Sequence, residues 1–160
     1  TKIANFRNVE KIPATENVIF AWTISPNIIA KKYEKKTPTL NKRLEDMEKA
    51  IASGWKVRLC FDPILDIKDY QKVYNEMFET VFSKISEEKF FDISTGIFRM
   101  NSDYLKRIQK FRMDSDILFS PFVKYARVES YSKEKISEIK EFIFSELTKY
   151  TSRKIFFSEP

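Results

Sequence analysis

The stretch that decides the fold is VRLCFDPI, residues 57–64. Its first half reads as a buried strand, and Asp62 and Pro63 then interrupt the apolar run. Because aspartate favours turns, we expect the strand to end here, with the Asp62 carboxylate where the chain leaves the sheet. In α/β proteins this edge, outside the carboxyl ends of the strands, carries the functional site. An ordinary Asp-Pro turn is the alternative interpretation.

Strand and helix patterns alternate on the amino-terminal side of this stretch. NVIFAWTI (17–24) is a short apolar run that suits a strand covered on both faces, and Pro26 opens a helix. The next helix is predicted to begin after Thr39, as N-cap, and to end before Gly54. The strand WKVRLCF (55–61) follows at once. A strand, helices and another strand form a crossover, which requires parallel pairing.

The alternation continues on the carboxyl-terminal side, with Ser102 as the expected cap of one helix. Three or four strands are too few to close an eight-stranded barrel of about 250 residues. We therefore expect one domain that is a segment of an open or partial barrel. The predicted elements are a helix (67–85), a strand (90–98), a helix (103–112), a strand or hairpin arm (122–129), a helix (132–150) and a terminal strand (154–160).

Composition narrows the class of protein. The 160 residues are 42% hydrophobic and 15% aromatic with only two glycines, which argues against disorder and against a turn-rich β-sandwich. Lysine and arginine number 29 against 23 aspartates and glutamates, a balance that permits binding to a polyanion. Because these charges are spread along the whole chain, a solvated basic surface is the favoured interpretation.

The chain has one cysteine, Cys60, and no histidine. This excludes Ser-His-Asp and Cys-His nucleophile pairs and nearly every zinc site, so we expect no metal ligands. A single cysteine also excludes an internal disulfide and suggests a reducing compartment. No apolar run approaches the roughly 18 residues of a membrane span. We expect a soluble, cytoplasmic protein without a membrane partner.

Five motifs follow one another along the chain. They are TK (1–2), FAWTIS (20–25), KYEKKTPTLNKRLEDMEKAIASGW (32–55), FDPI (61–64) and GIFR (96–99). The most telling part is Glu34, Thr37-Pro38 and Arg43, followed after a helix by Gly54 and FDPI. In their order and spacing the motifs resemble the carboxy-terminal half of the spore photoproduct lyase family of radical S-adenosylmethionine (SAM) enzymes.

The resemblance implies that residues 1–160 are the carboxy-terminal part of a partial (βα)6 radical SAM TIM-type barrel, with parallel strands and flanking helices. In that family SAM lies across the carboxyl ends of the strands, and a CxxxCxxC loop binds a [4Fe-4S] cluster. Such clusters need several thiolates, whereas this chain supplies only Cys60. We therefore expect the cluster-binding amino-terminal half to lie outside this sequence, and neither cofactor to assemble on this chain alone.

The resemblance also assigns cofactor-binding residues. Lys2 falls where the family has a SAM-contacting lysine, whose ammonium can pair with the methionyl carboxylate. Thr23 takes the place of a serine in the family motif FSIN, and its 21-residue separation from Lys2 is that of the family. Asp62 is the third expected SAM contact. The alternatives are a solvated lysine near the chain end, a strand threonine chosen for packing, and the Asp-Pro turn.

Substrate contacts are expected on the same rim. Arg99 is placed to meet a phosphate or a substrate carbonyl, whereas we interpret Glu34 and Arg43 as a structural ion pair. In the family a late basic and aromatic hairpin touches DNA, and KYARVESY (124–131) is the corresponding, shorter region. There Lys124, Tyr125 and Arg127 offer charge and a stacking surface. An exposed strand of alternating charge is the competing account.

Two functions follow. The first is a fragment of a spore photoproduct lyase-like enzyme that repairs thymine dimer lesions in DNA through a 5′-deoxyadenosyl radical, with this chain alone inactive and its catalytic residues unassigned. The second is a non-catalytic, basic nucleic-acid-binding domain without a redox centre. Binding to undamaged duplex with a steep salt dependence favours the second.

Overall fold

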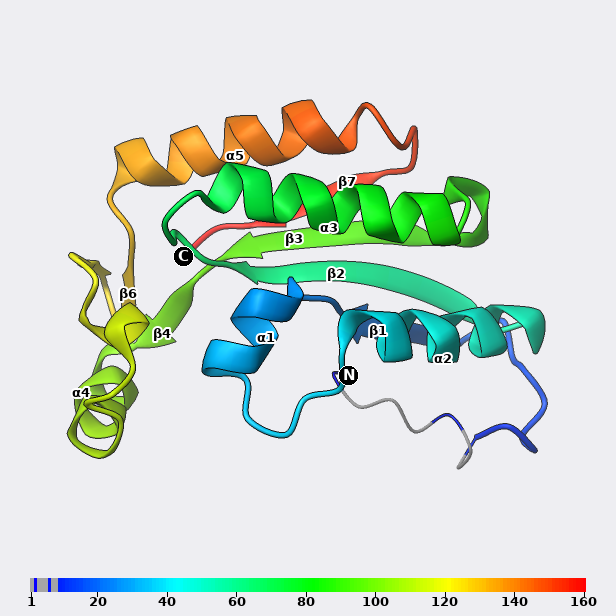
Figure 1. The fold of residues 1–160 in the computed structure, drawn as a ribbon, viewed down its shortest axis with the longest axis horizontal. Coiled ribbons are helices and arrows are strands. Elements are labelled where there is room, and N and C mark those ends of the chain that lie inside the picture. Colours follow the sequence, from blue (N-terminus) through cyan, green and yellow to red (C-terminus); the bar gives the residue numbers. More distant parts are fainter. Residues whose placement is uncertain (1, 3–5, 7–8) are drawn as a thin grey trace.

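The computed structural model describes residues 2, 6 and 9–160. Its main sheet has four strands in the order β1–β2–β3–β7, and all three pairings are parallel, as predicted (Figure 1). The order of the strands in the sheet follows their order in the chain, which is the arrangement produced by repeated strand–helix units. The strands are β1 (Ile19–Thr23), β2 (Lys56–Ile64), β3 (Asp92–Ile97) and β7 (Ile155–Ser158).

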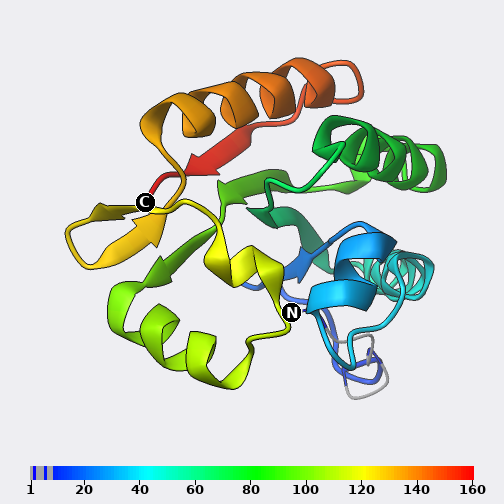
Figure 2. The ribbon, with the colours of Figure 1, turned by 60° about the vertical axis from the view of Figure 1, so that its left-hand side comes forward.

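The helices of these units lie together on one face of the main sheet (Figures 1 and 2). The Thr39 hydroxyl accepts a hydrogen bond from the Lys42 amide at 3.3 Å, and Gly54 has φ +85° just beyond the helix end, so both predicted helix signals are confirmed. The helices are α1 (Asn27–Tyr33), α2 (Leu40–Ala52), α3 (Tyr70–Lys84), the short 3-10 helix η2 (Glu87–Lys89) and α5 (Lys133–Leu147).

The core lies between these helices and the sheet. Side chains alternate along β2, and its apolar members pack against the helices, for example Phe61, whose ring meets that of Phe78 edge-on at 5.0 Å. Fully buried residues of this core include Leu44, Met47, Val57, Leu59, Phe61, Phe78, Val81, Ile93, Ile139, Ile143 and Leu147.

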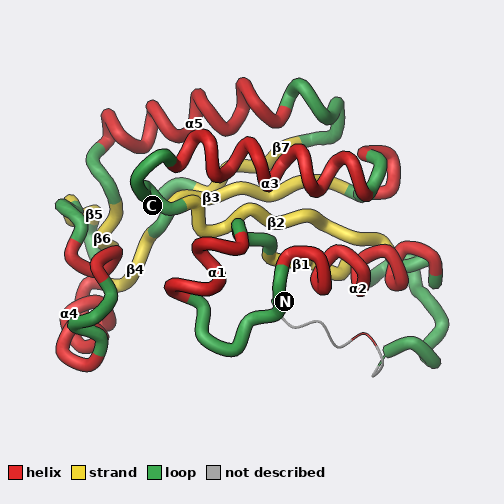
Figure 3. The backbone as a smooth tube through the Cα atoms, in the orientation of Figure 1, coloured by secondary structure: helices red, strands yellow, loops and turns green. Residues whose placement is uncertain are grey.

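In Figure 3 the helices α2 and α3 lie in front of the strands. The opposite face of the main sheet, which we call the open face, carries no helix within the described part of the chain (Figure 2). Ile19 and Ala21 of β1 are exposed there, and Arg58 and Cys60 of β2 are half-buried. The prediction that residues 17–24 are covered on both faces is therefore wrong for these residues. Parallel sheets are ordinarily covered on both faces, so the open face is an unusual feature.

Residues 99–130 form a separate unit, the rim lobe, at the end of the molecule seen on the left of Figure 1. Asn101, not Ser102, caps its helix, because the Asn101 side chain accepts from the amides of Asp103 and Tyr104 at 3.0 and 3.2 Å. The predicted hairpin is confirmed. The lobe has an antiparallel sheet in the order β4 (Arg99–Asn101), β6 (Val128–Ser130) and β5 (Val123–Tyr125), with α4 (Ser102–Phe111) and the 3-10 helix η3 (Asp116–Phe119).

Candidate functional site at the carboxyl ends of the strands

The strand β2 continues past the point where the sequence predicts its end. Its pairing with β3 is regular up to Phe61 and resumes at Ile64, with a shift of register between them. Asp62 and Pro63 occupy this irregularity, which is where a proline is tolerated in a sheet because it has no N–H to donate. Asp62 still lies close to the carboxyl end of β2, as expected.

Asp62 and Arg99 form a two-pronged ion pair at this edge. Arg99 Nη2 donates to Asp62 Oδ2 at 3.0 Å, and Nη1 donates to Oδ1 at 3.2 Å and to the Ile97 carbonyl at 3.1 Å. A Cβ on Gly96 would lie 2.7 Å from Asp62 Oδ2 and 2.8 Å from Arg99 Nη1. The ends of the two side chains therefore occupy the space that a Cβ at position 96 would need, which glycine leaves open. Arg99 lies at the predicted rim, and its contact with substrate stays a prediction.

Thr23 ends β1 beside the same edge, and its side chain is half-buried. It pairs in register with Cys60, and alternation along β2 puts Cys60 and Asp62 on one face. Arg43 of α2 is fully buried and fixes the backbone at this strand end. Arg43 donates to the carbonyls of Thr23 at 3.0 Å and Ser25 at 3.2 Å. Burial lowers the pKa of Arg43, and the nearby Glu34 opposes this.

Glu34 joins Lys2 to this strand end. Its Oε1 accepts from Lys2 Nζ at 2.5 Å and from the Ser25 hydroxyl at 2.8 Å. Its Oε2 lies 3.8 Å from Arg43 Nη1, so the predicted ion pair between Glu34 and Arg43 is confirmed. The same Oε2 is buried and accepts no hydrogen bond from the described residues. Lys2 is thus held beside β1 by a carboxylate, and its contact with SAM stays a prediction.

The open face carries a second ion pair, which lies nearer the amino ends of β2 and β3. Arg58 on β2 and Asp92 on β3 are register partners, and their two contacts measure 2.5 and 2.6 Å. Cys60 lies two residues beyond Arg58, and burial raises the pKa of its thiol. Sequence reasoning missed the ion pair, because 34 residues separate its members. Alternation along β2 is the signal that would have placed Arg58, Cys60 and Asp62 on one face.

The hairpin of the rim lobe carries the three residues predicted to meet DNA. Lys124 and Arg127 are exposed on either side of a turn in which Ala126 has φ +52°. Tyr125 is half-buried, and its hydroxyl donates to the Tyr131 carbonyl at 2.9 Å. Two side chains thus offer charge to solvent, whereas the tyrosine is tied to its own lobe.

The structure brings the predicted site residues together in two groups. Asp62 and Arg99 form one, and Lys2 and the end of β1 at Thr23 belong to the other. A hydrogen bond from the Ile24 amide to the Cys60 carbonyl at 2.8 Å connects the two strand ends. Ser25 and Gly96 complete the groups, and sequence reasoning did not assign either of them a role.

The donor set limits which groups these residues can hold. Among the described residues no three histidine, cysteine, aspartate or glutamate side chains are grouped as metal ligands. The whole sequence contains one thiol. This set does not fit a [4Fe-4S] cluster, which needs several thiolates. In the described part of the chain, no helix is long and apolar enough to cross a membrane.

A parallel sheet in sequential strand order, with its helices on one face and polar groups at its carboxyl ends, defines an α/β protein built from strand–helix units. The chain belongs to the spore photoproduct lyase family, whose model matches residues 1–156. A spore photoproduct lyase from Clostridium acetobutylicum is 23% identical over 159 residues, which cover 96% of this chain and 47% of that protein. The chain spans about half the length of this curated relative.

Solved structures of spore photoproduct lyases have the same fold. One, of a variant enzyme, superposes with a TM-score of 0.86 at 14% identity, over 99% of this chain and 50% of that one. Another, complexed with dinucleoside spore photoproduct, gives 0.83 at 15% identity over 99% of this chain and 50% of that one. A third, a variant with bound AdoMet and dinucleoside spore photoproduct, gives 0.81 at 14% over 98% and 48%. The α/β fold with a parallel sheet and flanking helices is thereby confirmed.

Proposed function

We propose that this chain is the carboxy-terminal half of a spore photoproduct lyase-like radical SAM enzyme, which repairs thymine dimer lesions in DNA. The observation that carries the proposal is the open face. A parallel sheet whose strands follow the chain order, with helices on one face, has the form of part of a barrel wall. Its other face is expected to be buried against further protein, because parallel sheets are ordinarily covered on both faces. The cover we propose is the cluster-binding amino-terminal half, which would complete a partial TIM-type barrel. The lyase relatives, about twice as long as this chain, support it.

The proposed cofactor site is the edge formed by Lys2, Thr23 and Asp62. The amino acid moiety of SAM carries one ammonium and one carboxylate, and this edge carries groups of both signs. The buried Glu34 Oε2 has no hydrogen-bond donor among the described residues and suits an ammonium, while Lys2 and Arg99 suit a carboxylate. The lyase structure with bound AdoMet supports SAM as the cofactor of such an enzyme.

The division of labour follows from the donor set. When bound in the completed enzyme, SAM and the cluster supply the 5′-deoxyadenosyl radical. This chain's own residues bind and orient SAM. Arg99 holds the Asp62 carboxylate in place, and Arg43 fixes the end of β1, where Thr23 lies. The lesion leaves the base stack to reach the edge, and Lys124 and Arg127 of the hairpin bind flanking phosphates.

The test is to join this chain to the part of the Clostridium acetobutylicum relative that it does not match. After anaerobic reconstitution with iron and sulfide, the joined protein is expected to bind SAM in equilibrium dialysis and to form 5′-deoxyadenosine. Asp62→Asn should weaken SAM binding, whereas Glu159→Gln, at the exposed chain end, should not. A folded, cluster-containing joined protein that binds no SAM would refute the proposal.

The second candidate function, a basic nucleic-acid-binding domain without a redox centre, is favoured by one observation. Lys124 and Arg127 are exposed together on a protruding hairpin, and neither has an ion-pair partner among the described residues. In a gel-shift titration this function predicts binding of undamaged duplex by the chain alone, with a steep salt dependence. No binding to any DNA would exclude it.

A further inference from the structure

Exposed large apolar side chains are frequent in the rim lobe. Five of the eleven exposed large hydrophobic residues in the described part of the chain lie between positions 104 and 123. Phe111 and Met113 are the most exposed of all, at 79% and 80%. Monomeric proteins rarely expose such residues as a group unless the surface binds something. The five are Tyr104, Phe111, Met113, Phe119 and Val123.

The same lobe is strongly basic. Residues 102–127 contain six lysines and arginines against three aspartates. Two of the aspartates are already paired, Asp114 with Arg112 at 3.2 Å and Asp116 with Lys32 of α1 at 2.8 Å. The remaining basic side chains have no acidic partner in the described structure. They are Lys106, Arg107, Lys110, Lys124 and Arg127.

Aromatic and basic residues alternate along one side of α4. Tyr104, Arg107 and Phe111 are spaced by three and four residues, so they lie along one stripe of the helix, and Lys110 adjoins it. The Arg107 guanidinium lies 5.2 Å from the centre of the Tyr104 ring. We call Tyr104, Arg107, Lys110 and Phe111 the α4 stripe. All four side chains are exposed.

The other side of α4 anchors the helix to the rest of the lobe. Leu105 is buried, and the Gln109 side chain donates to the Leu118 carbonyl of η3 at 2.8 Å. The α4 stripe is therefore presented to solvent by a helix whose inner side is fixed. A rigid platform of this kind loses little conformational entropy when it binds a partner.

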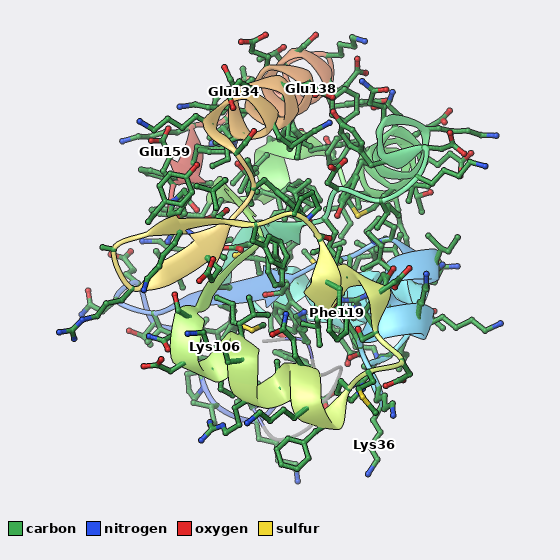
Figure 4. The ribbon with its side chains drawn as sticks, turned by 90° about the vertical axis from the view of Figure 1, so that its left-hand side faces the viewer. Lys36, Lys106, Phe119, Glu134, Glu138 and Glu159 are labelled. Atoms are coloured by element: carbon green, nitrogen blue, oxygen red, sulfur yellow. The ribbon has the colours of Figure 1, made fainter. Side chains whose placement is uncertain are left out.

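The lobe stands directly beside the proposed cofactor edge. Figure 4 looks at this end of the molecule, with α4 and η3 in the foreground and Lys106 and Phe119 labelled on them. β4 begins at Arg99, which is paired with Asp62, and ends at Asn101, directly before α4. A strand of DNA whose lesion lies at the edge would have its neighbouring nucleotides within reach of this surface.

We infer that the α4 stripe binds the DNA strand next to the lesion, with bases stacked on Tyr104 and Phe111 and phosphates on Arg107 and Lys110. This inference rests on the proposed function and adds a contact surface distinct from the hairpin. Single-stranded nucleic acid is bound by surfaces that combine positive charge with exposed aromatic rings, which is the composition found here. Lysine is depleted at protein-docking faces, whereas α4 exposes both Lys106 and Lys110 beside its aromatic residues.

The test is fluorescence anisotropy with a labelled oligothymidylate of about 12 nucleotides and the 160-residue chain, at salt concentrations from about 50 to 200 mM. Tyr104→Ala/Phe111→Ala should weaken binding at least about thirtyfold without changing its salt dependence, because it removes two stacking contacts and no charge. Arg107→Gln/Lys110→Gln should reduce the slope of log affinity against log salt by about 1.4, since about 0.7 belongs to each phosphate contact on a single strand.

Two further variants complete the design. Lys72→Gln/Lys149→Gln removes two exposed lysines from α3 and the α5 end, away from the stripe, and is expected to leave the affinity within about twofold of the wild type. Lys124→Gln/Arg127→Gln reports on the hairpin alone. Circular dichroism spectra verify that each variant is folded, which is expected because every changed side chain is exposed.

Three results would overturn the inference. One is wild-type affinity in both stripe variants while the hairpin variant loses binding, a result that leaves the proposed function standing. Another is the absence of any binding by the wild-type chain, and the proposed function would then be decided by SAM binding in the joined protein. The third is a wild-type dimer that Tyr104→Ala/Phe111→Ala converts to a monomer with unchanged DNA binding, as measured by sedimentation velocity.

Discussion

Replacing Arg43 with methionine should cost the chain a large part of its stability. Arg43 is fully buried and connects three segments, since it donates to the carbonyls of Thr23 and Ser25 and lies 3.8 Å from Glu34. Methionine keeps a similar volume and unbranched shape, so the change removes the charge and the two hydrogen bonds rather than opening a large cavity.

The magnitude follows from these contacts. Hydrogen bonds from a charged donor contribute about 1.5–3 kcal/mol each, and breaking a buried ion pair by removing one partner costs about 3–5 kcal/mol. Glu34 keeps Lys2 and Ser25 as partners, so the lower end applies. We expect Arg43→Met to lower the free energy of unfolding by about 3 kcal/mol. For a domain of this size that is a fall in Tm of about 6–12 °C.

The assay is urea denaturation followed by far-ultraviolet circular dichroism, with Arg107→Met as the matched control. Arg107 is exposed and outside any ion pair among the described residues, so the control should change stability by less than about 0.5 kcal/mol. A loss below about 1 kcal/mol for Arg43→Met would refute the reasoning that this guanidinium holds the carboxyl end of β1 in place.

Three further predictions concern the rim lobe, the cofactor edge and the donor set. Hydrogen bonds from Lys32 and Tyr33 lower the pKa of Asp116, so the contact between η3 and α1 is complete above the ordinary aspartate pKa and is lost as pH falls through the lowered value. Protection of the η3 amides against hydrogen exchange, relative to their intrinsic rate, should therefore fall only below about pH 4, and Asp116→Asn should abolish this pH dependence. Gly96→Ala should displace the flexible ends of the Asp62–Arg99 ion pair, with a stability loss of about 1 kcal/mol or less. The NMR signal of the Arg99 side chain should change clearly, and an unchanged signal would contradict the close approach of the pair to Gly96. Reconstitution of the chain alone with iron and sulfide should give no broad visible absorption, because one thiolate cannot hold a [4Fe-4S] cluster, and such absorption would contradict this.

The strands and helices of the main sheet could be predicted because each carries a local signal. Thr39 and Gly54 mark the two ends of α2, and the apolar run before Asp62 marks β2. One error has a tertiary cause, because β2 runs on through Pro63 where a register shift against β3 accommodates a residue without an N–H. The other error is local, because Asn101, itself a favoured N-cap residue, caps α4 in place of its neighbour Ser102.

The predicted site could be placed but its partners could not be foreseen. The family motifs indicated Asp62 and Arg99 separately, and only the fold pairs them across 37 residues. Lys2 likewise finds Glu34 across 32 residues. The exposure of the aromatic residues of α4 cannot be predicted from the sequence either, because a helical pattern of apolar residues does not reveal which side of the helix packs against a neighbour.

The most direct test of the account is the reactivity of Cys60, which lies on the open face of the main sheet and is half-buried there. Its alkylation rate by iodoacetamide is followed by mass spectrometry of the peptide that contains it, in the chain alone and in the joined protein. Closure of the sheet into a barrel predicts a rate at least about tenfold slower in the joined protein, because the thiol becomes enclosed. An equal rate in the two proteins would contradict the claim that this face is the inner wall of a barrel.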